Sequence, residues 1–163
     1  MINKITIIGV GLIGGSLAKA IKENKLAKVV FGYGRDFNRL EKAKKANVID
    51  QFSTNLKDAI NDSDIVIIAT PVGSFKEILI EIKPFLTSKI VISDVGSTKT
   101  NIASIVIQTL GDYSNNFIPA HPIAGKEKSG FEASESNLFN NRKVIITPLE
   151  TSSPDSINLI QKM

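Results

Sequence analysis

Several residue types and patterns are scarce in this chain of 163 residues, and each absence narrows its function. The chain has no cysteine, which excludes disulfide bonds and thiolate chemistry and fits a reducing compartment such as the cytoplasm. No apolar run approaches the ~20 residues that a membrane-spanning helix requires, so we expect a soluble protein without membrane contacts. Aromatic residues form only 6% of the chain and are not interleaved with its charges, so a stacking surface for nucleic acid is missing. The net charge of +4 is compatible with an anionic small molecule as the partner.

The first 20 residues superficially resemble a secretory signal, because a lysine, an apolar stretch and an Ala-Lys-Ala sequence follow one another. Four glycines interrupt the apolar stretch, however. A strand that turns into a helix explains these glycines, whereas a signal peptide does not. We therefore expect no signal peptide here.

What the chain does contain is an apolar, β-branched run that leads into a G-x-G-x-x-G turn and then into a helix-like segment. In such a turn Gly9 permits the tight bend, Gly11 leaves room for a pyrophosphate, and Gly14 lets the helix lie close to the sheet. Leu12 and Ile13 open the helix, whose N-terminal N–H groups attract an anion. This context favours dinucleotide binding; the alternative is a glycine-rich turn without a ligand.

Strand-like and helix-like segments alternate along almost the whole chain. This alternation predicts an α/β fold of the Rossmann type, a doubly wound and mostly parallel sheet with helices on both faces. We expect residues 1–163 to form one dinucleotide-binding domain. Because the last helix ends without a following strand, we also expect the chain to be a fragment of a longer protein. The expected strands are 4–9, 28–33, 64–69, 89–93, 116–119 and 143–147, with a short one near Val48 and Ile49, and the expected helices are 13–24, 37–46, 55–61, 75–86, 99–110 and 154–162.

The end of the second strand leaves the cofactor choice open. An acid that holds the adenine ribose is expected about 20 residues after the glycine turn, but Gly34 stands there, followed by Arg35 and Asp36. Arg35 is suited to a 2′-phosphate, which favours NADP, or to stacking on adenine. Asp36 caps the next helix or turns toward the ribose. We favour NAD and keep NADP as the alternative.

Two further segments follow predicted strands, where ligands bind in doubly wound sheets. Thr70, Pro71 and Val72 come after the strand at 64–69 and would border the nicotinamide ribose; an ordinary strand-to-loop junction is the alternative. His121, the single histidine of the chain, follows the strand at 116–119 and stands between two prolines. A neutral imidazole accepts a proton from an alcohol during hydride removal. We assign no metal ligands.

These segments together resemble the nucleotide-binding domain of the prephenate/arogenate dehydrogenase family, which serves tyrosine biosynthesis. The resemblance covers essentially the whole chain. It rests on the glycine turn, Ala69-Thr70-Pro71, Asp94-Val95-Gly96-Ser97-Thr98-Lys99, and the block from His121 to Gly130.

The resemblance implies an NAD(P)-dependent oxidoreductase that converts prephenate to 4-hydroxyphenylpyruvate by oxidative decarboxylation. It implies that His121 accepts the proton of the substrate hydroxyl, and that Ser97 lies beside His121, the nicotinamide and the substrate. A loop over the substrate would comprise the segment with Gly125, Glu127, Ser129 and Gly130.

The resemblance also implies a helical dimerisation domain after this one, which would supply an arginine to the substrate and make the complete protein a homodimer. Without it, we expect this chain to bind dinucleotide but to turn over prephenate poorly or not at all. The alternatives are an arogenate dehydrogenase, another Rossmann reductase and a nucleotide-sensing module without catalysis.

Overall fold

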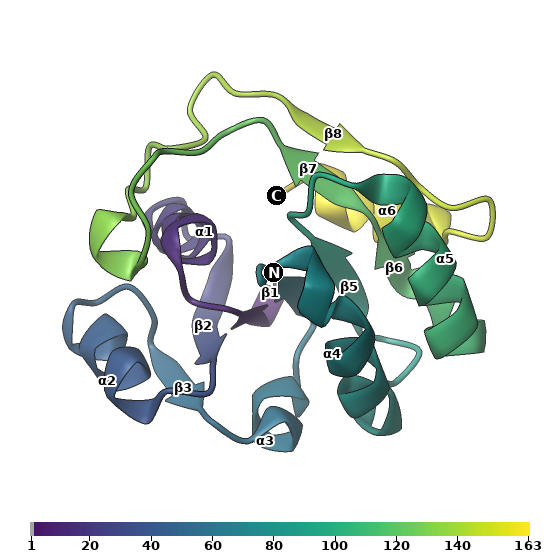
Figure 1. The fold of residues 1–163 in the computed structure, drawn as a ribbon, viewed down its shortest axis with the longest axis horizontal. Coiled ribbons are helices and arrows are strands. Elements are labelled where there is room, and N and C mark those ends of the chain that lie inside the picture. The colour runs from purple at the N-terminus through teal and green to yellow at the C-terminus, as the bar shows by residue number, and fades with distance from the viewer. Residues whose placement is uncertain (1) are drawn as a thin grey trace.

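A parallel six-stranded sheet forms the centre of the molecule (Figure 1). The computed structural model describes residues 2–163, without the side chains of Lys99 and Thr100. The strand order β3-β2-β1-β4-β5-β6 confirms the predicted doubly wound sheet, in which the order reverses between β1 and β4. The strands are β1 (Ile2–Ile8), β2 (Ala27–Tyr33), β3 (Gln51–Ser53), β4 (Ile65–Ile68), β5 (Val91–Asp94) and β6 (Phe117–Ile118).

Helices cover both faces of this sheet, as predicted (Figure 1). The α-helices are α1 (Leu12–Glu23), α2 (Phe37–Lys45), α3 (Leu56–Ile60), α4 (Phe75–Ile82), α5 (Lys99–Leu110) and α6 (Pro154–Gln161). Four short 3₁₀ turns accompany them: η1 (Val72–Ser74), η2 (Lys83–Phe85), η3 (Gly111–Asn116) and η4 (Phe131–Ala133).

The two faces of the sheet bury separate apolar clusters. Successive side chains of a strand point to opposite faces, so Ile65 and Ile67 of β4 join the cluster beneath α1, α2 and α6. Val66 and Ile68 join the other cluster, beneath α3, α4 and α5. All four β4 side chains are buried, which is typical of a central parallel strand. The carboxyl ends of β1, β4 and β5 therefore lie together at one edge of a rigid layer.

The short strand predicted near Val48 and Ile49 exists, but it does not include these two residues. Both side chains are only 1% exposed, but they lie in the loop after α2 and pack into the core. β3 begins two residues later, at Gln51. Burial of an apolar pair was therefore mistaken for strand structure, because a short apolar run alone does not distinguish the two.

The strand predicted at 116–119 is interrupted at Pro119. β6 ends at Ile118, and after Pro119 the chain enters β7 (Ala120–Pro122), which pairs antiparallel with β8 (Val144–Ile146). Proline has no N–H to donate, so the ladder of parallel hydrogen bonds stops there. The predicted strand at 143–147 exists, but it belongs to this two-stranded ribbon and not to the central sheet.

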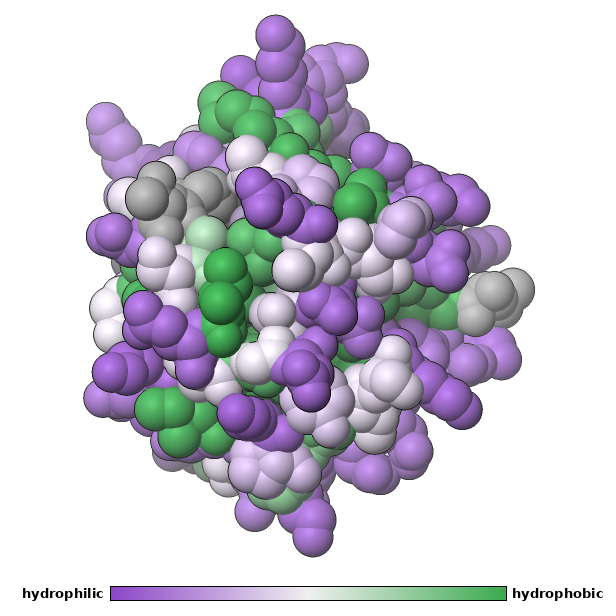
Figure 2. Space-filling model, turned by 90° about the vertical axis from the view of Figure 1, so that its right-hand side faces the viewer, coloured by the Kyte–Doolittle hydropathy of each residue, from purple (hydrophilic) through white to green (hydrophobic). Residues whose placement is uncertain are grey.

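Figure 2 shows the side of the molecule that lies on the right in Figure 1, where α5 is found. Hydrophilic residues cover most of this face, and hydrophobic residues appear between them in separate small patches. Ile80 of α4 and Ile107 of α5 are each 53% exposed. Scattered exposed apolar residues of this kind are normal for a protein surface. In the part of the chain that the structure describes, no helix has the length and apolar character needed to cross a membrane.

Candidate functional site

The turn between β1 and α1 is closely packed at two of its glycines. Gly9 has a φ of +96°, a backbone conformation that side chains disfavour, and a Cβ there would lie 2.9 Å from the carbonyl oxygen of Ala69. A Cβ at Gly14 would lie only 2.2 Å from the carbonyl oxygen of Gly9. Because both obstacles are backbone atoms, neither moves away easily. The fold itself therefore requires glycine at these two positions.

Gly11 is different, because the fold does not require glycine there. Its φ of −101° suits any residue. Among the described residues beyond its chain neighbours and its own helix, no atom lies within 4 Å of the place where a Cβ would be. The space in front of Gly11 is therefore open to a ligand.

This open space lies at the N-terminus of α1, for which Gly11 is the N-cap residue. The first N–H groups of a helix have no partner within it, and together with the helix dipole they attract an anion. Leu12, Ile13 and Gly14 form this first turn, which, as the structure describes it, carries no acidic side chain to repel an anion. The residues present fit a dinucleotide diphosphate.

Thr70, Pro71 and Val72 follow β4 at the same edge of the sheet. Gly9 and Thr70 are neighbours, because a Cβ at Gly9 would lie 2.8 Å from the Thr70 methyl group. The hydroxyl of Ser74 donates to the Thr70 hydroxyl at 3.0 Å, so Thr70 is also tied to η1. These residues lie at the carboxyl ends of β1 and β4, from which the chain continues to helices on opposite faces of the sheet. Doubly wound sheets bind their ligands at this point.

Beyond β2, the structure shows Asp36 in one of its two expected roles, as the cap of a helix. The carboxylate accepts from the Arg39 N–H at 3.1 Å and so caps α2. Arg35 is exposed. A Cβ at Gly34 would meet Leu40 at 3.6 Å, an ordinary contact, so this position has room for a side chain. The end of β2 therefore presents the cation Arg35, with no carboxylate at the position of Gly34.

Tyr33, the last residue of β2, connects this end to the glycine turn, because its carbonyl accepts from the Gly9 N–H at 2.9 Å. Burial raises the pKa of the Tyr33 phenol and the charge of Glu81 raises it further, while Arg35 lowers it. The phenol therefore stays protonated at neutral pH.

The sequence analysis missed Asp94, the last residue of β5. Its side chain is buried, with 1% exposure, and its two oxygens accept from the N–H groups of Gly96 at 2.8 Å and Ala120 at 3.1 Å. A signal was present, because a carboxylate ended an otherwise apolar strand and buried charges need partners. Ser97 lies one residue beyond Gly96, exposed in the bend before α5.

His121 is the middle residue of β7, opposite Ile145 of β8, and is half-buried. It directly follows Ala120, whose N–H is bound by Asp94. Ser97 and His121 therefore each stand one residue from a hydrogen bond to the same carboxylate. Parallel strands end at one edge, so His121 lies at the edge that also carries the glycine turn.

The segment with Gly125, Glu127, Ser129 and Gly130 runs from β7 across to η4, beside α1 (Figure 1). Glu127 and Ser129 are exposed on it, and Gly130 takes a φ of +89°. The structure thus places this segment at the edge of the candidate site.

The far end of this segment is fastened to α1 by two hydrogen bonds. The Lys19 ammonium donates to the Ser134 carbonyl at 2.6 Å, and the Glu135 N–H donates to the Ser16 hydroxyl at 3.0 Å. Lys126 forms an ion pair with Glu135 and holds the pKa of that carboxyl below its usual value. We call residues 123–135 the arm.

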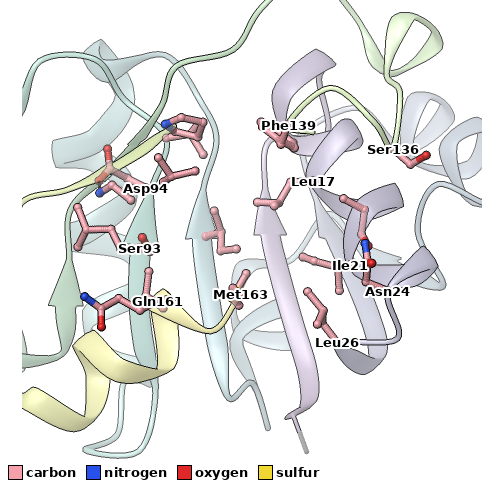
Figure 3. A pocket seen from close by; sticks show the side chains of 18 of the residues that line it. Leu17, Ile21, Asn24, Leu26, Ser93, Asp94, Ser136, Phe139, Gln161 and Met163 are labelled. Atoms are coloured by element: carbon pink, nitrogen blue, oxygen red, sulfur yellow. Dashed lines mark hydrogen bonds between the residues drawn. The ribbon is translucent and has the colours of Figure 1, made fainter. Parts of the chain in front are cut away.

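An open cavity of about 780 Å³ lies between α1, the β7–β8 ribbon and α6. Figure 3 shows Leu17 and Ile21 of α1 on one side and Gln161 and Met163 at the end of α6 on the other. Much of its lining is apolar, including Val144 of β8. Its lining, all within the described residues, includes neither the glycines of the turn nor Ser97 or His121. This groove does not include the glycine turn, but it adjoins the candidate site at Asp94, Ala120 and Pro122.

Comparison with known proteins identifies the domain. Residues 17–163 match the family model of the prephenate dehydrogenase nucleotide-binding domain. The chain is 35% identical over 146 residues to cyclohexadienyl dehydrogenase of Zymomonas mobilis, covering 88% of this chain and 48% of that protein. It is 33% identical over 164 residues to prephenate dehydrogenase of Bacillus subtilis, covering 100% and 44%. The chain thus spans about half the length of these curated relatives.

Solved structures agree with these matches. Prephenate dehydrogenase from A. aeolicus, in complex with hydroxyphenyl propionate and NAD+, superimposes with a TM-score of 0.91 at 31% identity, covering 99% of this chain and 56% of that one. Synechocystis arogenate dehydrogenase gives a TM-score of 0.89 at 30% identity, covering 98% and 55%.

Proposed function

Because this chain belongs to the prephenate dehydrogenase family, as its nucleotide-binding domain, we propose that it forms half of an enzyme that oxidises prephenate with NAD. The observation that carries the proposal is the pairing of two features at one edge of the sheet. One is the open space at Gly11 before the N-terminus of α1, and the other is the lone histidine on β7. A nucleotide site and a base at the same edge are what a hydride-transfer reaction needs.

The cofactor-binding residues divide the dinucleotide between them. The N-terminus of α1 binds the diphosphate, Thr70 to Val72 border the nicotinamide ribose, and Gly34 to Asp36 lie at the adenine ribose. When bound, NAD supplies the acceptor for the hydride. Ser97 stands beside the nicotinamide and orients His121 by its hydroxyl.

In the reaction, the ring carbon that bears the hydroxyl loses a hydride, and His121 accepts the hydroxyl proton as general base. The bond to the ring carboxylate breaks and carbon dioxide leaves. The electron pair of that bond completes the aromatic ring and leaves a phenolate oxygen, which takes a proton to give 4-hydroxyphenylpyruvate. Aromaticity makes the overall step strongly favourable. Gly125, Glu127, Ser129 and Gly130 contribute the loop that covers the substrate.

NADP is the second cofactor that the site suits. A carboxylate that would repel a 2′-phosphate is replaced by Gly34, and the exposed Arg35 follows it. Asp36, the nearest acid in sequence, is occupied as the cap of α2. Arginine at this place accommodates a 2′-phosphate in Rossmann folds. We propose that the enzyme prefers NAD, which is bound in the A. aeolicus relative, and that these features let it also accept NADP.

Arogenate is the second candidate substrate, since the Synechocystis relative is an arogenate dehydrogenase. The two substrates differ only in the side chain opposite the reacting hydroxyl. The same His121 chemistry serves both.

The rest of the longer protein completes the site in this proposal. A helical second domain packs on the apolar groove between α1 and α6, supplies an arginine for the ring carboxylate, and joins two copies into a homodimer. Val144 and Ile145 of β8 are apolar but 50% and 48% exposed in this chain, which supports the proposal that the second domain covers the ribbon. We place the enzyme in the cytoplasm, in the pathway to tyrosine.

The test is an assay of the complete gene product with prephenate and arogenate, each with NAD and NADP. We expect reduced nicotinamide and carbon dioxide in equal amounts. His121→Asn should lower kcat by about 10²–10⁴-fold, the contribution typical of a general base. The wild-type rate should also fall in acid, because an imidazolium cannot accept a proton, and the variant should lack this dependence.

A His121→Asn enzyme with near-normal turnover would contradict the assignment of the base. Ser97→Ala should lower kcat by about tenfold while leaving the melting temperature unchanged. Unchanged kinetics would make Ser97 a residue without a part in the reaction. NADH titration of each variant is the control, since neither substitution alters the glycine turn.

A further inference from the structure

We propose that Asp94 is a positioning residue that holds Ser97 and His121 in one fixed arrangement, although it does not itself touch the substrate. The proposal rests on the proposed function. It is carried by the two hydrogen bonds that one buried carboxylate accepts from two separate segments, the bend after β5 and the strand β7.

The first hydrogen bond replaces an interrupted sheet ladder. β5 and β6 pair at Ser93 and Ile118, the last residues to do so. Pro119 follows with no N–H to donate, and the chain leaves the sheet. The next N–H belongs to Ala120, which is 5% exposed and so needs a partner. Oδ1 of Asp94 accepts from it at 3.1 Å and sets where β7 begins.

The second hydrogen bond fixes the bend that carries Ser97. Oδ2 of Asp94 accepts from the Gly96 N–H at 2.8 Å. A Cβ at Gly96 would lie 2.9 Å from that same oxygen, so glycine is what lets the carboxylate stay in place. Ser97 directly follows. Hydrogen bonds to a charged acceptor are about twice as strong as neutral ones, and burial stops water from competing for them.

The two bonds together make a single rigid connection. Moving the carboxylate shifts Gly96 and Ala120 at once, and with them the residues one position further on. Asp94 is only 1% exposed and both of its oxygens are bound by backbone N–H groups, so its influence on the reaction passes through its neighbours. A displacement of 1 Å at a reacting group costs on the order of 10²-fold in rate.

Asp94→Asn is the first test, in the complete gene product. An amide has one oxygen to accept with, and its NH₂ group faces an N–H donor, so one of the two bonds breaks. We expect kcat to fall about 30- to 100-fold, while KM for NAD and NADH affinity change less than about threefold, because the glycine turn stays intact.

Ser93→Ala is the matched control on the same strand. The Ser93 hydroxyl is buried and donates to the Ile118 carbonyl at 2.7 Å, so its loss weakens β5 and β6 without reaching Gly96 or Ala120. It should lower the melting temperature to a similar degree as Asp94→Asn but leave kcat within about threefold of wild type. Equal losses of kcat in the two variants would overturn the proposal, because loss of stability would explain both.

Gly96→Ala serves where Asp94→Asn does not fold. Its methyl group displaces the carboxylate by contact, and we again expect kcat to fall with NADH affinity retained. In parallel, amide hydrogen exchange of this chain should accelerate at both Gly96 and Ala120 in either variant. In Asp94→Asn one bond breaks directly, and the other weakens because the side chain then moves. Acceleration at only one of the two amides would overturn the connection.

These readouts separate the two proposals. A wild-type protein that oxidises neither prephenate nor arogenate refutes the proposed function, and the exchange rates still decide whether Asp94 holds both segments. An active wild type with an unchanged kcat in Asp94→Asn refutes the positioning role alone.

Discussion

The glycine turn and the β7–β8 ribbon lie at the same edge of the sheet but are held in place very differently. At the turn, a Cβ at Gly14 would come within 2.2 Å of the Gly9 carbonyl, and the turn joins β1 of the central sheet to the helix α1 that packs on it. At the ribbon, two strands of three residues pair only with each other, and the outer strand exposes Val144 and Ile145. One region is determined by contacts within a few residues, whereas the other depends on distant ones.

This difference separates binding from chemistry. The glycine turn at the cofactor end is held within the central fold, between β1, α1 and the residues that follow β2 and β4. The end that carries His121 is positioned by the Asp94 carboxylate and by the arm. One side of the β7–β8 ribbon also borders an open apolar groove. We therefore expect substitutions to affect the two ends independently.

Gly14→Ala should have the largest effect on stability, because the added methyl group disrupts the packing of the turn. Alanine favours a helix over glycine by about 1 kcal/mol, but the overlap with the Gly9 carbonyl outweighs that gain. Overpacking of this kind costs about 3 kcal/mol, which lowers Tm by roughly 10 °C for a domain of this size. Thermal unfolding and NADH titration measure the result, and an unchanged Tm would contradict the packing argument.

Gly11→Ala is the matched variant, three residues earlier in the same turn. No described atom beyond its neighbours and helix obstructs the methyl group, so Tm should stay within about 3 °C of wild type. The methyl group occupies the space of the diphosphate, and a loss of about 2 kcal/mol corresponds to about 30-fold weaker NADH binding. Retained affinity would show that the ligand does not approach Gly11.

Gly34→Asp should change the choice of cofactor without changing the fold. The new side chain meets Leu40 at an ordinary contact distance, and its carboxylate binds a ribose hydroxyl but repels a 2′-phosphate. We expect the ratio of NADH to NADPH affinity to rise about tenfold. Gly34→Asn, similar in shape but uncharged, should leave the ratio nearly unchanged. An equal rise in both variants would argue against an electrostatic cause.

The smallest effect concerns the arm. Lys126 lowers the pKa of the Glu135 carboxyl, first by their hydrogen bond and then by its charge, with Lys128 a weaker contributor. Because the pKa is lowered in the folded state, the pair stabilises the arm above about pH 4.3 and is lost as acid protonates the carboxyl. In Lys126→Met, an NMR titration should show the Glu135 midpoint move up. Lys128→Met should move it less, and a larger shift there would reverse the assignment.

The parts predicted from sequence are those determined by near neighbours. The turn from Gly9 to Gly14 combines a strand, three glycines and a helix within a few residues, so its pattern is legible in the chain itself. The helix expected at 99–110 agrees with α5 because its residues repeat with helical spacing and Gly111, at a φ of +58°, ends it. Alternation of such segments was enough to predict the doubly wound sheet.

The parts that sequence did not predict involve partners far along the chain. Asp94 and Ala120 are 26 residues apart, and the sequence around either residue does not predict their hydrogen bond. The break at Pro119 becomes intelligible only once β8, more than 20 residues later, is seen beside β7. Likewise, Val48 and Ile49 are apolar because they fill the core beside α2. A short apolar run in the sequence does not reveal whether it packs as a loop or as a strand.

The vacancy beside Gly11 has an evolutionary consequence. No described atom beyond its neighbours and helix obstructs a methyl group at this position, so folding does not require glycine there. Selection for glycine at residue 11 therefore depends on nucleotide binding alone. In a lineage that no longer binds the cofactor, we expect Gly11 to be substituted first, while Gly9 and Gly14 are retained because the fold requires them.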